Sequence, residues 1–269
     1  MLFRSPAWKA RAIADITRRD VRELLEKIAE RAPVMANRVL AVTRKMFNFA
    51  IDQELIEVNP AARVTRPGGV EQSRDRVLSD DEVRAFWTAC EGLTPQMAAY
   101  YRLRLLTAQR GAEVGGMRWQ DVDLSAGWWT ISAAVAKNKR AHRVPLAPSV
   151  VQMVEALAPD VEKRDGFVLA GARGRRQQSE AATVFASIAN FHGHDLRRTA
   201  ASRMTGGGVP RLTVSRILNH VETGVTAVYD RHSYDAEKHA ALDWWATRLA
   251  SIIDSNADGA AVLPFARRA

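Results

Sequence analysis

The chain has 269 residues, of which 47% are hydrophobic and 26% charged, a composition typical of a globular protein with one large domain or two modest ones. Its 39 Lys and Arg against 30 Asp and Glu give a formal charge of +9, which favours a polyanionic partner, nucleic acid first. A single cysteine, Cys90, excludes an internal disulfide and a cysteine-based metal cluster. No apolar run approaches the ~20 residues needed to cross a bilayer, and residues 1–10 lack the apolar core of a secretory signal. A soluble, intracellular protein is therefore expected.

The first sixty residues are predicted to form two helices. The first follows Thr17, a residue type that caps helices. Its apolar positions recur with helical spacing at Val21, Leu24, Leu25 and Ile28. The second helix is predicted to begin after Pro33 and to end near Pro60, because proline disfavours helix in the residue before it. Its expected buried side consists of Val39, Val42, Met46, Phe49 and Ala50.

Basic side chains are concentrated in this part of the chain. Residues 1–70 carry thirteen basic and eight acidic side chains, a net of +5 out of the total of +9. A solvated surface is the ordinary explanation of such an excess. The density of arginine nevertheless favours contacts to a DNA backbone, for which Arg38, Arg44 and Lys45 on the second helix are the candidates.

A change of composition separates two domains. Residues 63–76 lack periodicity and contain Pro67, Gly68 and Gly69, which predicts a linker after a short helical domain over residues 1–62. The sequence Ser79-Asp80-Asp81-Glu82 then has the pattern of a capping box, with Leu78 before the cap, and opens a second domain over residues 77–253. Residues 254–269 show no pattern and are expected to be a flexible tail.

The second domain is predicted to be mainly α-helical with a small three-stranded antiparallel sheet. Helices are expected from Asp80 to about Cys90 and from Pro95 to Leu106. Three short segments rich in β-branched and aromatic residues predict the strands: Trp119–Leu124, Trp128–Ala133 and Ala141–Leu146. Helical patterns then return at Ser149–Leu157, Ala181–Asn190, His194–Thr205, Pro210–Asn219 and Ala236–Ile253.

Four separated groups of polar residues could carry chemistry. They are the pair Arg110 and Glu113, the basic turn with Lys137, Lys139, Arg140 and Arg143, the pair His194 and Arg197, and the pair His220 and Tyr229. Each alone has an ordinary structural explanation, such as a surface ion pair on one helix face or a solvated hairpin tip. His192 and His194 could also form a metal pair, but no third ligand lies at a recognisable spacing.

Taken together, in this order and spacing, the four groups resemble the tyrosine recombinase (phage integrase) family. The catalytic domain of that family carries an arginine with a nearby acidic residue, a lysine on a β-hairpin, a His-x-x-Arg pair, a second histidine and then a tyrosine. The likeness runs from about Val77 to Trp245, and the stretch from Leu218 to Lys238 is especially similar to integrases of prophages and genomic islands. The first sixty residues resemble the family's helical core-binding domain.

Two departures from the family pattern stand out. Ala108 occupies a position at which the family usually has glycine, and this is expected to tighten the turn before Arg110. The chain also shows no arm-binding domain ahead of a short core-binding domain. A truncated or degenerate member of the family is therefore expected.

The resemblance implies a DNA recombinase that works through a 3′-phosphotyrosine intermediate and needs neither a metal nor another cofactor. The roles it implies are nucleophile for Tyr229, phosphate binding for Arg110 and Arg197, proton donation to the leaving oxygen for Lys137, help with proton transfer for His194, a hydrogen bond to the phosphate for His220, and orientation of Arg110 for Glu113. Two of these roles, nucleophile and proton donor, have more than one candidate residue of the right type. Tyr234 competes with Tyr229, and Lys139 or Arg140 with Lys137, and in both cases the spacing favours the first-named residue.

The partners that the resemblance implies are double-stranded DNA, a tetramer assembled on two paired recombination sites, and accessory DNA-bending proteins. The expected location is the cytoplasm of a bacterium, at the nucleoid and away from membranes. The last predicted helix, Ala236–Ile253, either docks on a neighbouring protomer or packs on its own domain. Two other functions stay open: an inactive integrase remnant that only binds DNA, and an enzyme like the type IB topoisomerases, which relaxes supercoils as a monomer.

Overall fold

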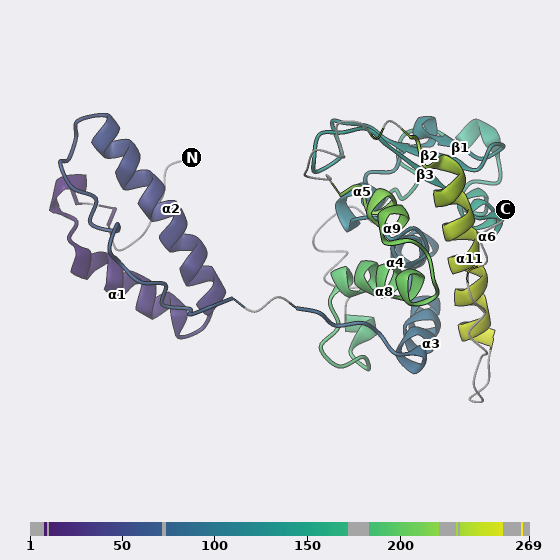
Figure 1. Ribbon diagram of the computed structural model, residues 1–269, viewed down its shortest axis with the longest axis horizontal. Coiled ribbons are helices and arrows are strands. Elements are labelled where there is room, and N and C mark those ends of the chain that lie inside the picture. The colour runs from purple at the N-terminus through teal and green to yellow at the C-terminus, as the bar shows by residue number, and fades with distance from the viewer. Residues whose placement is uncertain are drawn as a thin grey trace. The chain divides into compact units, whose positions relative to one another are not determined.

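The computed structural model describes residues 8–9, 11–71, 74–171, 183–220, 230, 232–254 and 265. The chain forms two compact units, Met1–Arg74 and Asp75–Ala269 (Figure 1), and each has a hydrophobic core of its own. Within the described ranges, no helix is both long enough and apolar enough to cross a membrane.

The first unit is a helical hairpin. A single 3-10 turn, η1 (Ile13–Asp15), precedes α1 (Arg18–Ala29) and α2 (Pro33–Asp52), and the two helices pack against each other. Thr17 caps α1 as predicted: its side chain accepts a hydrogen bond from the backbone N–H of Asp20, and the Asp20 carboxylate accepts one from the backbone N–H of Thr17. The core of this unit consists of Ile16, Val21, Leu25, Leu40, Phe47, Ala61 and Val64.

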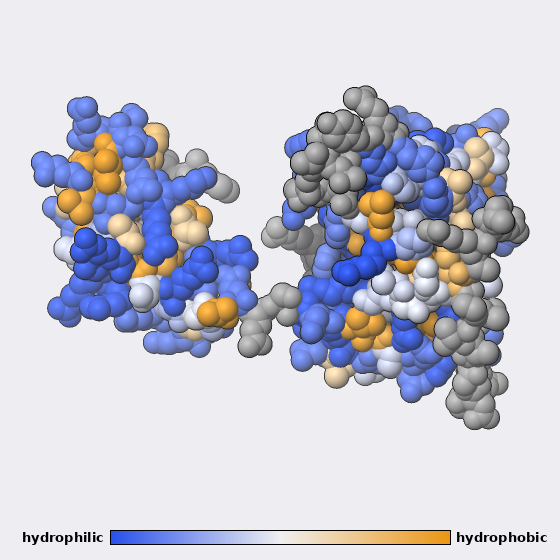
Figure 2. Space-filling view, in the orientation of Figure 1, coloured by the Kyte–Doolittle hydropathy of each residue, from blue (hydrophilic) through white to orange (hydrophobic). Residues whose placement is uncertain are grey.

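One prediction about the second helix is wrong, and another is right only in part. The helix ends at Asp52, because Glu54 adopts a left-handed backbone conformation (φ 55°) and the N–H of Leu55 turns back to the carbonyl of Ala50. Its buried face consists of Ala36, Asn37, Leu40, Thr43, Phe47 and Ala50. Of the predicted buried side, Ala50 is buried and Val39 and Met46 are half-buried against the core, whereas Val42 and Phe49 are 48% and 63% exposed. The helix carries apolar residues on two faces. The face that packs also contains the polar residues Asn37 and Thr43, so its apolar pattern is harder to recognise in the sequence. Figure 2 shows exposed apolar side chains on this unit.

Part of the segment predicted as a linker packs on α2. Val64 is only 6% exposed, and the guanidinium of Arg44 donates to the carbonyls of Ala61 and Val64. The Asn37 side chain accepts a hydrogen bond from the N–H of Gly68 and donates one to the carbonyl of Gly69. The first unit therefore holds residues well beyond 62, and the two units divide between Arg74 and Asp75.

The second unit is mainly helical with a three-stranded antiparallel sheet, as predicted. Among the described residues, its helices of five or more residues are α3 (Asp80–Ala89), α4 (Pro95–Thr107), α5 (Gly111–Gly115), α6 (Pro148–Glu155), α8 (Gly193–Gly206), α9 (Arg211–Ile217) and α11 (Asp235–Asp254). Short 3-10 turns lie between them: η2 (Cys90–Gly92), η3 (Trp119–Asp121), η4 (Val161–Lys163) and η5 (Thr183–Phe185). The sheet has the order β1 (Val122–Asp123), β2 (Trp128–Ile131), β3 (His142–Pro145).

Local signals placed most of these elements correctly. Ser79 and Glu82 form the predicted capping box at the start of α3. The strand predicted over Trp119–Leu124 is shorter than expected, because Trp119–Asp121 forms the turn η3 and only Val122–Asp123 pairs in the sheet. The helix expected over Ala181–Asn190 is wrong, because the described part of that segment contains only the turn η5. There the ring of Phe185 is buried and stacks on that of Phe86, with centroids 5.1 Å apart, so burial of an aromatic residue determines the local conformation.

The last helix, α11, belongs to the core of its own unit. Ala241, Trp245, Leu249 and Ile252 are at most 1% exposed, and the indole N–H of Trp245 donates to the carbonyl of Leu105 on α4 (2.9 Å). The alternative in which this apolar face docks on a neighbouring protomer is therefore wrong.

The predicted flexible tail, 254–269, lies outside the described residues except for Asp254 and Phe265. The N–H of Phe265 donates to the carbonyl of Gly207 (2.8 Å), and its ring meets that of Trp244 edge-on.

Candidate active site

The turn between α4 and α5 begins the site. α4 ends at Thr107, and Ala108 then adopts the left-handed conformation (φ 57°, ψ 19°) while fully buried. A residue with a Cβ is strained there and glycine is not, which gives a physical reason for the glycine usual in the family. The turn aims the carbonyl of Ala108 at Arg197, whose Nη1 donates to it at 2.6 Å. It also places Arg110 immediately before the first turn of α5.

Arg110 is held by a buried carboxylate. The Oε1 of Glu113 accepts from Nη1 of Arg110 at 2.9 Å, and its Oε2 accepts from the backbone N–H of Arg110 at 3.0 Å. The Glu113 side chain is 2% exposed and that of Arg110 is 23% exposed. The pair is therefore not a surface ion pair. The carboxylate lies inside and fixes the direction of a guanidinium that still reaches the surface.

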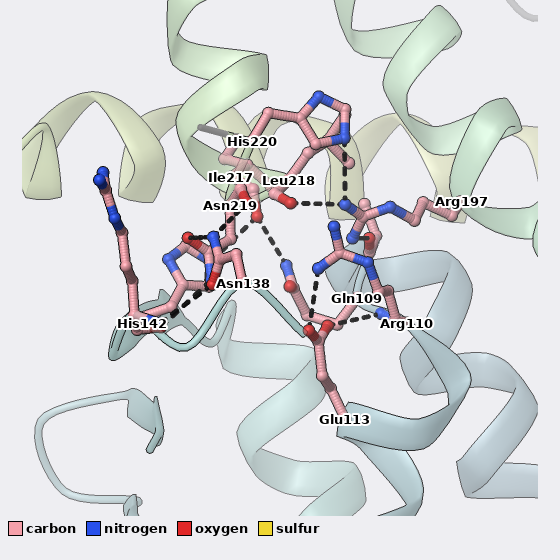
Figure 3. A network of polar contacts seen from close by, with 12 residues as sticks. Gln109, Arg110, Glu113, Asn138, His142, Arg197, Ile217, Leu218, Asn219 and His220 are labelled. Atoms are coloured by element: carbon pink, nitrogen blue, oxygen red, sulfur yellow. Dashed lines mark hydrogen bonds and ion pairs between the residues drawn. The ribbon is translucent and has the colours of Figure 1, made fainter. Parts of the chain in front are cut away.

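Arg197, on α8, lies beside Arg110. Figure 3 shows the two guanidinium groups near each other, with the ring of His220 on the far side of Arg197. Arg197 is 4% exposed and donates to the carbonyls of Ala108 and Leu218, and its Nη2 lies 3.5 Å from Nε2 of His220. Burial and the neighbouring positive charge of Arg110 lower the pKa of Arg197 to about 10, so it stays charged at neutral pH.

Three successive backbone carbonyls at the C-terminal end of α9 accept hydrogen bonds from the other elements that form the site. Such carbonyls have no partner within their own helix, so they need donors from elsewhere. Ile217 accepts from Nε2 of Gln109 (2.9 Å) and from the ring of His142 (3.0 Å), Leu218 accepts from Arg197, and Asn219 accepts from Asn138 (2.9 Å). These donors come from the α4–α5 turn, β3, α8 and the β2–β3 loop, and they converge on the residues just before His220 (Figure 3).

The β2–β3 loop carries the predicted basic residues. Asn138 and Asn219 pair through their side-chain amides, which joins this loop to the end of α9. Lys137, Lys139 and Arg140 are exposed around that joint, and within the described ranges no ion pair holds the side chain of Lys137. This leaves the Lys137 ammonium free to meet an anion brought by a partner.

Arg143 points elsewhere. Its guanidinium pairs with Asp235 at 3.0 Å and lies 4.2 Å from the ring centroid of Trp128. These contacts give it a structural role between β3 and α11, and its predicted role in DNA binding stays a prediction.

His142 is buried on β3 beneath the site. Its side chain is 8% exposed, and burial, reinforced by the charge of Lys238, lowers its pKa to about 4. It is therefore neutral at pH 7, and its Nε2 must carry the hydrogen that is donated to the carbonyl of Ile217.

His194 opens α8 next to this cluster. Partial burial, and then the positive charges of Arg198, Arg197 and Arg104, lower its pKa. Its neutral form is therefore favoured at pH 7, which is the form that accepts a proton. His192, two residues earlier, turns its Nδ1 to the carbonyl of Asn190 (3.2 Å). Among the described residues, no three His, Cys, Asp or Glu side chains come together as a metal site.

The structure thus brings together Arg110, Glu113, Arg197 and His220, with His194 and the Lys137 loop around them. Tyr229 lies outside the described residues. Tyr234, its competitor, donates its hydroxyl hydrogen to Asp230 at 2.8 Å, and this hydrogen bond raises its pKa. A phenol held in this way is a poor nucleophile, which agrees with the spacing argument for Tyr229.

The predicted DNA-binding residues of the first unit have different surroundings. Arg38 is exposed and pairs with Glu71 (2.8 Å), Lys45 is exposed, and Arg44 is used to hold the chain at Ala61 and Val64. Sequence reasoning missed a cavity of about 310 Å³ whose lining includes Arg18, Arg22 and Arg63. In the second unit it missed Gln109, Asn138, His142 and Asn219. The only signal for them was that the carbonyls ending the helix before His220 would need donors.

A helical unit with a small sheet, in which two guanidiniums converge beside a histidine, is the arrangement of the tyrosine recombinases. The chain belongs to the phage integrase family: the family matches residues 76–236, and the phage integrase central domain matches residues 4–66.

Known relatives of the chain are prophage and phage integrases. The prophage integrase IntZ of Escherichia coli K12 is 30% identical over 93% of this chain, and the integrase of Shigella phage Sf6 is 24% identical over 88% of it. The chain spans 64% of the length of each of these two proteins.

Solved structures show the same fold. A lambda integrase (75–356) dimer bound to a COC′ core site superposes with a TM-score of 0.60, at 20% identity, over 78% of this chain and 81% of the other. A lambda integrase tetramer bound to a Holliday junction gives a TM-score of 0.62, at 18% identity, over 82% of this chain and 66% of the other.

Proposed function

We propose that this chain is a site-specific DNA recombinase that cleaves and rejoins strands through a 3′-phosphotyrosine intermediate. Its biological task, on this proposal, is to integrate or excise a prophage or genomic island in the bacterial cytoplasm, at the nucleoid. The observation that carries the proposal is the convergence of Arg110 and Arg197 next to His220, with the carboxylate of Glu113 buried behind Arg110.

The two arginines suit a phosphate in the transition state. Negative charge builds on the non-bridging oxygens of a phosphodiester under attack, and a guanidinium can donate two parallel hydrogen bonds to them. Both side chains are already fixed, Arg110 by Glu113 and Arg197 by two backbone carbonyls, so little reorganisation is needed. Preorganised donors of this kind contribute roughly 3–4 kcal/mol each, by analogy with oxyanion holes.

Cleavage exchanges one phosphoester bond for another. The phenolic oxygen of Tyr229 forms a bond to phosphorus as the bond between phosphorus and the 5′ oxygen breaks. Neutral His194 helps to take the phenolic proton, and Lys137 gives a proton to the departing 5′ oxygen. His220 donates a hydrogen bond to the phosphate. The reverse step, with a 5′ hydroxyl of a partner strand as the attacking group, rejoins DNA without any loss of bond energy.

The partner on this proposal is duplex DNA, and exchange requires four protomers on two paired sites. Support comes from the fold shared with lambda integrase, whose solved forms include a dimer on a core site and a tetramer on a Holliday junction. Accessory DNA-bending proteins would act when the paired sites are brought together.

Trapping the covalent intermediate tests the proposal. Suicide substrates, in which the cleaved strand loses its short 5′-hydroxyl end, should give a protein–DNA adduct on a denaturing gel. Tyr229→Phe should bind DNA normally and form no adduct, because the ring remains and only the nucleophile is gone. Tyr234→Phe is the matched control and should still form it. No adduct from the wild type would contradict the proposal, whereas an adduct that maps to Tyr234 would contradict only the assignment of Tyr229 as the nucleophile.

The suicide substrate and a plasmid assay together separate the other two functions. An inactive remnant binds the duplex but gives no adduct with any substrate. A topoisomerase-like enzyme relaxes supercoiled plasmid as a monomer and needs no paired sites, whereas the recombinase produces joined recombinant strands only when two sites are present.

A further inference from the structure

A third guanidinium lies beside the candidate active site without an assigned role. Arg104 is on α4, and its Cζ lies 5.2 Å from the ring centroid of Tyr100 and 5.8 Å from that of Tyr101. Its Nη1 is 3.5 Å from the hydroxyl of Tyr100, a long hydrogen bond. The aromatic faces hold the flat guanidinium in one place while leaving most of its N–H groups unused.

Two glycines show how close Arg104 is to the catalytic side chains. A Cβ added to Gly193 would lie 2.5 Å from Nη1 of Arg104, and one added to Gly111 would lie 3.1 Å from its Cζ. Gly193 precedes His194, and Gly111 follows Arg110. The guanidinium is therefore packed against the first residues of α5 and α8, where the site is built. Its charge is also felt by His194.

The charge of Arg104 has no acidic partner in the described part of the chain. No carboxylate there lies within ion-pair distance of it, and its Nε is buried without a hydrogen bond. Holding a cation partly out of water without a counter-ion costs free energy, and a ligand that supplies the negative charge recovers that cost.

Arg102, two residues earlier on the same helix, is a close comparison. It too stacks on an aromatic ring, with its Cζ 4.6 Å from the ring centroid of Trp87. It differs in having partners, since it donates to the carbonyl of Trp87 (3.1 Å) and lies 4.0 Å from the carboxylate of Glu91. The Nε of Arg102 is, like that of Arg104, buried without a hydrogen bond, so the difference lies in the charge: that of Arg102 has a carboxylate nearby, whereas that of Arg104 has none among the described residues.

We propose that Arg104 binds a DNA phosphate that flanks the scissile one, and so adds a third guanidinium to the pair formed by Arg110 and Arg197. The flanking phosphate is assigned because Arg110 and Arg197 already supply donors for the scissile group, while the guanidinium of Arg104 packs against Gly193, the residue before His194. This inference rests on the proposed function, but it concerns binding and can be tested without cleavage.

The test is the salt dependence of binding to a fluorescein-labelled duplex of 30 base pairs, for full-length wild type, Arg104→Gln and Arg102→Gln. Each phosphate contact contributes about 0.9 to the slope of log affinity against log salt concentration. Arg104→Gln should lower the slope by about 0.9, so that between 50 and 200 mM salt it loses about 3.5-fold less affinity than the wild type does. Arg102→Gln should keep the wild-type slope.

A slope for Arg104→Gln equal to that of Arg102→Gln would overturn the inference. Should Arg104→Gln fail to fold by circular dichroism, Arg104→Met keeps the apolar stem against Tyr100 and Tyr101 and is measured against Arg102→Met. Failure of this inference and failure of the proposed function can be told apart. If the salt slope of Arg104→Gln falls by about 0.9 but the wild type forms no covalent adduct, the phosphate contact of Arg104 is supported and the recombinase function is contradicted.

Discussion

At the scale of single residues, the identity of the proton donor is the sharpest question. Lys137 is exposed on the β2–β3 loop next to Asn138, whose amide pairs with Asn219 just before His220. Replacing Lys137 by Ala should slow cleavage of an unmodified DNA strand by about 10²-fold to 10⁴-fold, the range for loss of a general acid. A substrate whose 5′ oxygen is replaced by sulfur should be cleaved almost normally, because a thiolate leaves without a proton.

Lys139→Ala is the matched control for that experiment, since it removes an ammonium from the same exposed loop. It should weaken binding at most and leave the ratio of the two cleavage rates at its wild-type value. Rescue by sulfur in Lys139→Ala and not in Lys137→Ala would transfer the role to Lys139.

His142 makes a separate prediction about stability. Its pKa in the folded protein is about 4, against an ordinary value of 6.5, so between these pH values the unfolded chain binds a proton that the folded protein does not. The free energy of unfolding should therefore fall as the pH is lowered from 7.5 to 5, with a contribution from His142 of about 2 kcal/mol.

Urea unfolding at the two pH values measures this change. His142→Gln retains a donor for the carbonyl of Ile217 but does not titrate, so it should lose most of the pH effect. His239→Gln replaces a histidine that is 40% exposed on α11, and should keep the effect. Equal pH dependence in wild type and His142→Gln would show that other groups are responsible.

At the scale of elements, the C-terminal end of α9 connects the parts of the site. The joint between Asn138 and Asn219 is one of its four side-chain contacts, and it links the Lys137 loop to the residue before His220, together with a long hydrogen bond (3.5 Å) from the Asn219 amide to the carbonyl of Arg140. Loss of a half-buried amide pair costs about 1–1.5 kcal/mol, so Asn138→Ala should slow cleavage about tenfold while the affinity for duplex DNA changes little. Asn138 acts here as a positioning residue.

The sulfur substrate shows what Asn138 positions. Full rescue of Asn138→Ala would mean that the change misplaces Lys137 only, and absence of rescue would mean that it also misplaces His220. Asn138→Asp should be no better than Ala, because its carboxylate cannot donate to the carbonyl of Asn219. Unchanged cleavage in both variants would contradict a positioning role.

What the sequence could predict about these elements follows from how local each signal is. The caps at Thr17 and Ser79 and the three strands are set by neighbouring residues, and the structure confirms them. The buried face of α2 was predicted only in part, because two faces of that helix are apolar and only the position of α1 decides between them. The helix expected before Asn190 does not form where the structure describes that segment. Phe185 there packs on Phe86, again a contact between residues distant in sequence.

The same distinction applies to the site. The order of Arg110, Lys137, Arg197 and His220 could be read from spacing, because the family resemblance ties each to its motif. The contacts that fix them could not. Gln109 reaches Ile217 across 108 positions of the chain, and Arg197 reaches Ala108 across 89, so only the folded unit shows which donor meets which carbonyl.

At the scale of the whole molecule, charge is shared between two separately folded units. Residues 1–70 hold +5 of the +9, which leaves +4 for the rest of the chain. Each unit has its own core, so the second can be prepared as residues 75–269 and compared with the full chain. Binding by both units together should involve six or more phosphates, and affinity should then fall about 10³-fold between 50 and 200 mM salt.

Removal of the first unit should weaken binding severely and also flatten the salt response, because the phosphate contacts of Arg38, Lys45 and their neighbours are lost. Arg44→Gln should act differently, because the guanidinium of Arg44 donates hydrogen bonds to the carbonyls of Ala61 and Val64. It should lower the thermal midpoint of the first unit and leave the salt slope of the protein that remains folded almost unchanged. A salt response as steep for residues 75–269 as for the full chain would show that the first unit contributes no phosphate contacts, whatever its net charge.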